Sequence, residues 1–175
     1  MKNLLFSGMK HCGKSSVGRA VAEILQRQFV DLDDCLPRQK NESVRQLYQR
    51  LGAEEFRRLE AETFLRFAPD QGVVLALGGG VCSNPFLTAG QLREMGNMVY
   101  LEVDKDVLFA RIAADGIPPT LSQENFYHSF CCQLEERKKD YEALAHVIWH
   151  PAVEDPVQVT AEKLVKELYR QGLIV

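Results

Sequence analysis

The stretch LLFSGMKHCGKSSVG, residues 4–18, carries the strongest structural signal in the chain. It begins with a short apolar run typical of a buried β-strand. Residues 8–15 then fit the pattern G-x-x-x-x-G-K-[ST], whose backbone N–H groups curl around phosphate oxygens. Apolar residues at helical spacing follow as far as residue 28, so the loop opens an amphipathic helix whose positive end faces the anion. Strand, glycine loop and helix in this order predict a binding site for nucleotide phosphates.

Each residue type in this loop has a chemical task. Lys14 is expected to reach the β- and γ-phosphates, and the Ser15 hydroxyl is expected to ligate Mg²⁺. The alternative is a structural glycine turn with a chance Lys-Ser pair, which would need neither the strand before it nor the helix after it. The predicted nucleotide-binding residues are Gly8, His11, Cys12, Gly13, Lys14, Ser15 and Ser16.

Beyond the loop, short apolar runs alternate with amphipathic stretches along the whole chain. Alternating strands and helices predict a parallel sheet with helices on both faces. The fold class is therefore α/β, a three-layer α/β/α arrangement around a central five-stranded parallel sheet. Strands are predicted at residues 3–7, 29–32, 73–77, 97–103 and 146–150, and helices at residues 15–28, 43–67 (two helices interrupted by Gly52), 106–114, 129–144 and 157–170.

Bulk composition limits the classes of function. The chain has 175 residues, the size of one domain, with 46% hydrophobic and 26% charged residues as in ordinary globular proteins. Its net charge of −3 predicts no nucleic-acid or membrane partner, so any anionic ligand must be held by locally placed Arg and Lys. No apolar run reaches the roughly 18 residues of a membrane helix, and the start is too short for a signal peptide, so a cytoplasmic location is expected. The five cysteines follow no regular framework and are expected to be reduced.

Two carboxylates follow the second predicted strand. In Phe29-Val30-Asp31-Leu32-Asp33 they occupy alternate positions, and alternate side chains of a strand point the same way. They are expected at the carboxyl end of the strand, where sheets of this kind bind ligands. One carboxylate could assist Mg²⁺ and the other accept a hydroxyl proton. The alternative is a solvated acidic strand end.

Three further features bear on the second substrate. Arg57 and Glu60 are three residues apart and share a helical face. Gly78-Gly79-Gly80 follows a predicted buried strand and allows a ligand to approach the backbone closely. Arg137 begins a polar run that ends at Tyr141 on a late helix. Taken singly, the alternatives are an exposed charged helix, a bare turn and a solvated basic face.

Taken together and in this order, the motifs resemble those of the shikimate kinases over essentially the whole chain. The family pattern has a phosphate loop, then F-x-D-x-D, F-R-x-x-E, G-G-G and R-x-x-x-Y, matched here at residues 8–15, 29–33, 56–60, 78–80 and 137–141. The resemblance implies a P-loop kinase fold, a single kinase domain over residues 1–175, an acceptor-binding segment at 31–60 and a lid at 113–127. It also implies transfer of the γ-phosphoryl group of ATP to the 3-hydroxyl of shikimate, giving shikimate 3-phosphate and ADP in chorismate and aromatic amino acid biosynthesis. The implied enzyme is a monomer that binds ATP and shikimate and needs Mg²⁺.

The resemblance assigns a role to each matched residue. Lys14 and Ser15 bind the ATP phosphates and Mg²⁺, and Asp31 lies near the metal, so Ser15 and Asp31 form the implied metal site. Asp33 binds acceptor hydroxyls and serves as the base, so Lys14 and Asp33 are the implied catalytic residues. Arginine forks suit the acceptor carboxylate. The implied substrate-binding residues are Asp33, Arg57, Glu60, Gly78, Gly79, Gly80 and Arg137, with the arginines on the carboxylate beside the Gly79 backbone and Glu60 orienting Arg57 or a hydroxyl.

Two positions depart from the family pattern. His11 stands where the family loop has a third glycine. The family lid carries an arginine before Pro-Leu, whereas residues 112–136 of this chain contain no Arg or Lys. A transition-state arginine is worth roughly 10³–10⁵ in rate. Either another cation replaces it, with Arg111, Lys138 and Lys10 as candidates, or the enzyme is slow, or turnover is lost. The retained acceptor residues favour replacement or modest slowing.

Two other functions compete with this interpretation. One is a different small-molecule P-loop kinase, with gluconate or a nucleoside monophosphate as acceptor, against which the F-R-x-x-E motif and the triple glycine argue together. The other is a catalytically weak nucleotide-binding protein whose role is interaction, supported only by the missing lid arginine. That protein would bind ATP without shikimate-dependent release of ADP.

Overall fold

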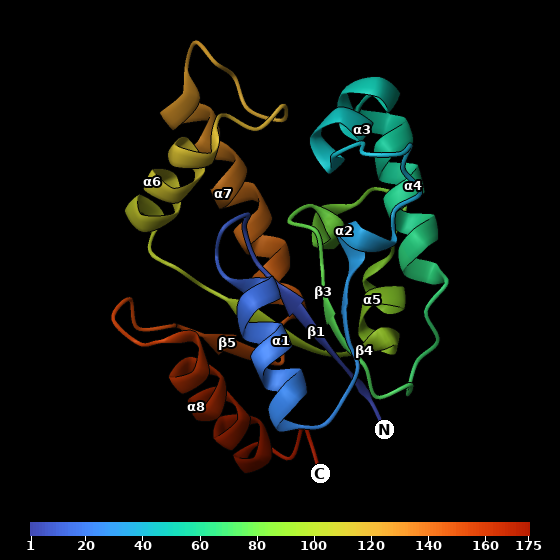
Figure 1. Ribbon diagram of the computed structural model, residues 1–175, viewed down its shortest axis with the longest axis vertical. Helices are drawn as coiled ribbons and strands as arrows, with labels where there is room; N and C mark the ends of the chain where they lie inside the picture. The colour runs from blue at the N-terminus through green and yellow to red at the C-terminus, as the bar shows by residue number, and fades with distance from the viewer.

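The computed structural model describes residues 1–175, and its centre is a five-stranded sheet in the order β2-β3-β1-β4-β5 (Figure 1). Every neighbouring pair of strands is parallel. The predicted three-layer α/β/α fold with five parallel strands is confirmed. The strands are β1 (Asn3–Ser7), β2 (Phe29–Asp31), β3 (Val74–Ala76), β4 (Gly96–Leu101) and β5 (Val147–Trp149).

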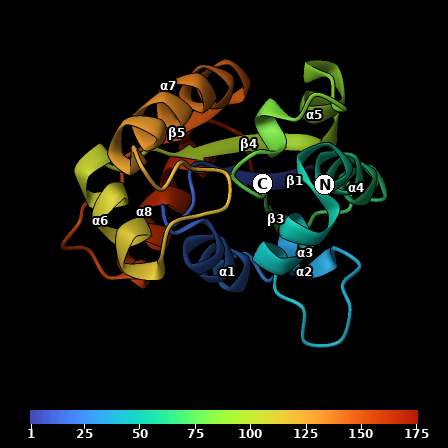
Figure 2. The same cartoon turned by 90° about the horizontal axis from the view of Figure 1, so that it is seen from above.

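Helices cover both faces of the sheet. Figure 2 shows α1 on one side of β1 and β4, with α5 and α7 on the other side, and α8 packs against α1. Both chain termini lie at one end of the molecule, while α3 and the loop after α6 lie at the opposite end (Figure 1). The helices are α1 (Lys14–Ile24), α2 (Leu32–Cys35), α3 (Val44–Leu51), α4 (Ala53–Leu65), α5 (Ala89–Met95), α6 (Lys105–Asp115), α7 (Phe126–Leu144) and α8 (Val157–Arg170), with a 3₁₀ turn η1 (Val81–Ser83).

The main hydrophobic core surrounds β1, every residue of which is buried. One buried polar side chain, Asn3, joins three separate segments at the start of this strand. Its amide nitrogen donates to the carbonyls of Ala68 at 3.0 Å and Met95 at 2.9 Å, and its oxygen accepts from the Val73 amide at 3.2 Å. Because each polar atom of this side chain has a partner, its burial costs little. The contacts fix the ends of the segments that lead into β3 and β4.

A second, smaller core lies beneath α2, α3 and α4, and it is separate from the first. Leu36, Leu47 and Phe56 are its buried members. Gly52 separates α3 from α4, as the sequence predicted. Its φ of 80° lies in the region that favours glycine. A capping box between Ser43 and Gln46 begins α3. The middle of the acceptor-binding segment predicted at residues 31–60 therefore folds around apolar contacts of its own, while Leu32 belongs to the main core.

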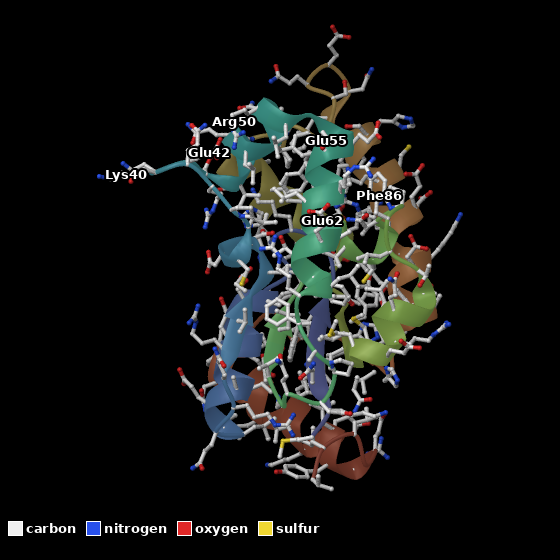
Figure 3. All side chains as sticks on the ribbon, turned by 90° about the vertical axis from the view of Figure 1, so that its right-hand side faces the viewer. Lys40, Glu42, Arg50, Glu55, Glu62 and Phe86 are labelled. Carbon is white, nitrogen blue, oxygen red and sulfur yellow. The ribbon has the colours of Figure 1, made fainter.

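The outer surface of this helical unit is charged. Figure 3 shows Glu55 and Glu62 pointing outward from α4, and Lys40 extending into solvent from the loop before α3. Arg50 of α3 donates to Glu42 of the same loop at 2.7 Å. These side chains face away from the sheet and leave the opposite side of α4 for buried contacts.

The sequence-based elements differ from the structure in several places. The strand prediction for residues 29–32 was too long: β2 ends at Asp31, and Asp33 lies in α2. The alternation argument for these two carboxylates was therefore wrong, because Asp31 is the N-cap of α2 and its side chain accepts from the Asp33 amide. The helix α5 was not predicted, and α7 begins at Phe126 rather than at residue 129. No helix has the length and apolar character required to cross a membrane.

Candidate active site

A cavity of about 660 Å³ opens at the end of the sheet where β1, β2 and β3 reach their carboxyl ends. Ligands bind at this edge in open parallel sheets. Its lining includes most predicted site residues, while Gly8 and Cys12 of the phosphate loop are not among the lining residues and Cys12 is buried. The predicted residues brought together here are His11, Gly13, Lys14, Ser15, Ser16, Asp31, Asp33, Arg57, Glu60, Gly78, Gly79, Gly80 and Arg137.

The phosphate loop between β1 and α1 has the backbone that its glycines were expected to permit. Gly8 and Gly13 have φ values of 138° and 97°, and a Cβ at Gly8 would lie 2.8 Å from the Leu101 carbonyl oxygen. His11 has φ 65°, so the position that departs from the family pattern adopts a left-handed conformation that glycine adopts more readily.

Lys14 is buried, and its ammonium donates to the carbonyls of Gly8 at 2.9 Å and Met9 at 2.8 Å.

Two oxygen groups suited to a divalent cation lie beside Lys14. The Ser15 hydroxyl donates to Oδ2 of Asp31 at 2.5 Å, and Oδ1 of Asp31 accepts from the Asp33 amide at 3.1 Å. No group of three or more His, Cys, Asp or Glu side chains could hold a metal ion. Mg²⁺ fits this donor set, because it binds through one or two protein oxygens together with water and substrate phosphates. Ser15 and Asp31 are therefore the residues that could hold it.

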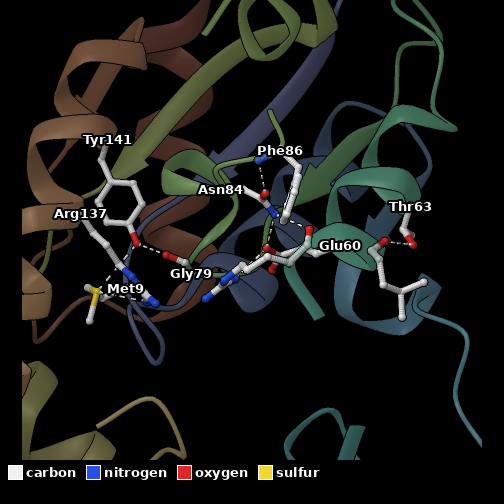
Figure 4. A network of polar contacts seen from close by, with 10 residues as sticks. Met9, Glu60, Thr63, Gly79, Asn84, Phe86, Arg137 and Tyr141 are labelled. Atoms are coloured by element: carbon white, nitrogen blue, oxygen red, sulfur yellow. Dashed lines mark hydrogen bonds and ion pairs between the residues drawn. The ribbon is translucent and has the colours of Figure 1, made fainter. Parts of the chain in front are cut away.

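Helix α4 contributes an ion pair to the cavity wall, and a residue from outside this helix donates hydrogen bonds to both members of the pair. Nη1 of Arg57 donates to Oε2 of Glu60 at 2.7 Å, and Glu60 is only 2% exposed. Asn84, which follows η1, donates to the same carboxylate oxygen at 2.9 Å and to the Arg57 carbonyl at 2.8 Å (Figure 4). Asn84 Oδ1 in turn accepts from the Phe86 amide at 2.9 Å. Sequence reasoning missed Asn84, because no motif distinguishes an asparagine four residues after a glycine turn.

Helix α7 supplies Arg137, the second arginine predicted to bind the acceptor. Arg137 and Tyr141 lie one turn apart, and the Tyr141 hydroxyl donates to the Gly79 carbonyl (Figure 4). Tyr141 and Arg137 also reach the Met9 sulfur at 3.8 and 4.0 Å. Burial lowers the pKa of Arg137, and the nearby charge of Arg57 lowers it further. Two positively charged guanidinium groups repel each other in a site shielded from solvent. They are therefore suited to share one anionic ligand.

Gly79 and Gly80 make room for these two arginines. A Cβ at Gly80 would lie 2.2 Å from Nη1 of Arg57, and a Cβ at Gly79 would lie 3.3 Å from Nη1 of Arg137. Neither glycine has a positive φ, so the backbone conformation does not demand glycine at either position. The requirement is for space, which agrees with the close approach expected from the triple glycine.

Gly78 performs the same function for two carboxylates. A Cβ there would lie 2.9 Å from Oε1 of Glu60 and 3.1 Å from Oδ1 of Asp33. Burial, followed by the negative charges of Asp31 and Glu60, raises the pKa of Asp33 from 3.8 to about 6. A carboxyl group with this pKa is predominantly ionised at neutral pH and is a stronger base than an ordinary aspartate.

The third side of the cavity is formed by the segment between α6 and α7, the core of the predicted lid at residues 113–127. Residues 118–121 line the cavity, and residues 113–115 belong to α6. Of the three cations proposed to replace the lid arginine, Lys10 and Arg111 line the cavity, whereas Lys138 does not. Lys138 instead pairs with Glu102 and with Glu142. Its candidacy was therefore wrong.

Comparison with known proteins relates this geometry to a family. The family model for shikimate kinase matches residues 10–169. The shikimate kinase of Dechloromonas aromatica is 32% identical over 174 residues, covering 97% of this chain and 90% of that protein. That of Sulfurihydrogenibium sp. is 30% identical over 168 residues, covering 95% of this chain and 98% of that protein.

Solved structures agree with the sequence relatives. The shikimate kinase from Acinetobacter baumannii in complex with shikimate superimposes with a TM-score of 0.87 at 25% identity, covering 99% of this chain and 96% of that one. A gluconokinase from Sinorhizobium meliloti, at 20% identity and 97% coverage of both chains, has a TM-score of 0.58 and shares the fold alone.

Proposed function

Because the chain belongs to the shikimate kinase family and is a kinase that transfers phosphate from ATP to shikimate, we propose how its own residues carry out this transfer. The observation that carries the proposal is a single cavity that joins the phosphate loop to Arg57 and Arg137 and to the carboxylates of Asp33 and Glu60. We propose the 3-hydroxyl of shikimate as the attacking group and shikimate 3-phosphate and ADP as the products. The enzyme acts as a monomer in the cytoplasm, and a sedimentation measurement tests its oligomeric state.

Arg57 and Arg137 bind the carboxylate of shikimate. They come from α4 and α7, and the glycines beneath them leave both guanidinium groups in the cavity. A guanidinium fork matches a carboxylate through two parallel N–H bonds, so the pair orients the ring as well as holding it. The related kinase from Acinetobacter baumannii was solved with shikimate, which supports an acceptor of this chemistry.

Asp33 binds the shikimate hydroxyls and removes the proton from the attacking one. Its pKa of about 6 supports this role, because the group is ionised at neutral pH and accepts a proton more readily than an ordinary aspartate. As the hydroxyl oxygen bonds to the γ-phosphorus, the bond to the β-phosphate oxygen breaks and the hydroxyl proton passes to Asp33. Glu60 pairs with Arg57 and keeps that guanidinium turned toward the acceptor.

Lys14 and the loop amides bind the ATP phosphates. Ser15 and Asp31 would hold Mg²⁺, which supplies positive charge to the β- and γ-phosphate oxygens when it is bound. Residues 118–121 exclude water from the transferring group by covering the cavity. The residues of this chain therefore bind, orient and shield the substrates, and the only proton they move is that of the acceptor hydroxyl.

The first experiment measures ADP release with MgATP, with and without shikimate, for the wild type, Arg57→Ala and Arg58→Ala. Arg58 is the adjacent residue in α4, and its guanidinium pairs with Glu54 on the outer surface. We expect shikimate-dependent turnover that collapses in Arg57→Ala and persists in Arg58→Ala. Intact MgATP binding without shikimate-dependent release of ADP by the wild type would reject the proposal.

A further inference from the structure

The positive charges around the active-site cavity are unevenly distributed. Arg57 and Arg137 face the acceptor, and Lys14 lies at the phosphate end. The segment between α6 and α7, whose residues 118–121 line the cavity, contributes no Arg or Lys, since residues 112–136 contain none. Three other Lys or Arg side chains line the cavity and could add to the charge that Lys14, the loop amides and Mg²⁺ supply to the transferring phosphoryl group. These are Lys10, Arg45 and Arg111.

Two of these three cations are bound to backbone carbonyls. Arg111 donates to the carbonyl of His11 at 3.1 Å. Arg45 of α3 donates to the carbonyls of Gly116 at 3.2 Å and of Ile117. The first contact connects α6 to the phosphate loop, and the second connects α3 to the segment after α6. Each arginine therefore already bonds the backbone at the edge of the cavity.

Lys10 has a partner that is easily exchanged. Its ammonium donates to Oδ2 of Asp115 at 2.7 Å, and both side chains are about half exposed, at 50% and 52%. The same oxygen lies 3.1 Å from Nε2 of His11. An exposed ion pair of this kind contributes little to stability. The phosphate groups of a nucleotide can therefore compete with Asp115 for the lysine.

The backbone of Lys10 lies at the junction of the two substrate sites. Its amide nitrogen is 3.4 Å from the position of a Cβ on Gly79, and that same position is 3.3 Å from Nη1 of Arg137. Lys10 is also part of the phosphate loop itself, four residues before Lys14. Its flexible four-carbon stem allows the ammonium to turn from Asp115 toward the loop without a movement of the backbone.

We propose that Lys10 is a further catalytic residue, whose ammonium leaves Asp115 when ATP binds and contacts the oxygens of the transferring phosphoryl group from the acceptor side. Lys10 acts by stabilising negative charge in the transition state. Asp115 holds the ammonium away from the phosphates until nucleotide arrives. This inference rests on the proposed function, because it assumes transfer from ATP to a hydroxyl bound beside Gly79.

The test compares Lys10→Met and Lys10→Arg with Lys40→Met, a matched change at the exposed lysine of the loop before α3. Shikimate-dependent ADP release gives kcat and the KM of each substrate. We expect Lys10→Met to lower kcat roughly 10²-fold while the KM for shikimate changes less than about threefold. Lys10→Arg should restore most of kcat, which a purely structural role of the methylene stem would not explain. Lys40→Met should match the wild type.

Asp115→Asn separates the catalytic role from the ion pair. If Asp115 competes with ATP for Lys10, this variant should lower the KM for ATP by about two- to fivefold. A loss of kcat in Asp115→Asn as large as in Lys10→Met would overturn the inference, because the contact itself would then be what matters. Retention of kcat within about threefold by Lys10→Met would also overturn it. Absence of turnover in both the wild type and Lys40→Met would instead reject the proposed function.

Discussion

Gly80 lies directly against the guanidinium of Arg57: a Cβ at position 80 would be 2.2 Å from Nη1 and 2.4 Å from Cζ of that arginine. The contact is with the planar end of the side chain, which is also bonded to Glu60. An arginine held between a carboxylate and a bare backbone has few alternative rotamers. The glycine therefore determines where the guanidinium lies, although it makes no polar contact with it.

Gly80→Ala should displace Arg57 and impair acceptor binding. A displacement of about 1 Å in a positioning group costs as much as 10²-fold, and we expect a fall of this order in kcat/KM for shikimate. Affinity for MgATP should persist, because the phosphate loop is unchanged. Steady-state kinetics and calorimetric titration with nucleotide measure the two effects. Gly90→Ala is the matched control, since its Cβ would meet only Thr88 Oγ1 at 3.8 Å. Wild-type kinetics in Gly80→Ala would contradict the packing argument.

The pH dependence of the reaction should report the ionisation of Asp33. Its pKa of about 6 means that the basic form is lost as the pH falls through 6. We expect kcat/KM for shikimate to be level above pH 7 and to drop about tenfold per unit below 6. Asp33→Asn should abolish most activity and remove this inflection from what remains. A wild-type profile that stays level down to pH 5 would exclude Asp33 as the base.

The same carboxylate should lower the stability of the protein at neutral pH. The folded pKa of Asp33 is raised from 3.8 to about 6, so the folded state binds its proton more tightly than the unfolded state. Its contribution to stability is greatest below the unfolded pKa and is lost as the pH rises through the folded one. Asp33→Asn should therefore raise Tm at pH 7.5 and have little effect at pH 4. Thermal unfolding at both values checks this sign, and a Tm lowered at pH 7.5 would contradict it.

Asn84→Ala should weaken both the fold and acceptor binding. The variant removes the amide group that donates to the carbonyl of Arg57 and to the buried carboxylate of Glu60. Loss of bonds to a buried charged group costs about 1–3 kcal/mol, which urea unfolding would measure. The KM for shikimate should rise with it, because Glu60 loses part of its support. Ser83→Ala, at the exposed neighbouring position, should leave both quantities unchanged.

The sequence predicted the strands of the sheet because apolar runs and glycine turns are local signals. It did not reveal their order, which depends on contacts between distant segments. The Arg57–Glu60 pair could be predicted from helical spacing, whereas the meeting of Arg57 with Arg137 was reached only through the family resemblance. The error at Asp33 arose because α2 is a single turn begun by a side-chain cap, which hydrophobic periodicity does not detect. Asn84 was missed because its contacts are entirely tertiary.

The second core has a consequence for how the protein opens. Leu36, Leu47 and Phe56 form a cluster that shares no buried member with the main core, whereas Leu32 of α2 and Phe64 of α4 belong to the main core. The segment 36–56 can therefore unfold locally while the sheet remains intact. In the proposed function shikimate binds between Arg57, which follows this segment, and Arg137 of the main body, and a ligand that binds only the closed form stabilises that form by mass action. The substrate therefore protects its own binding site. Amide exchange and proteolysis should begin in residues 36–56 and should slow there first when shikimate is added.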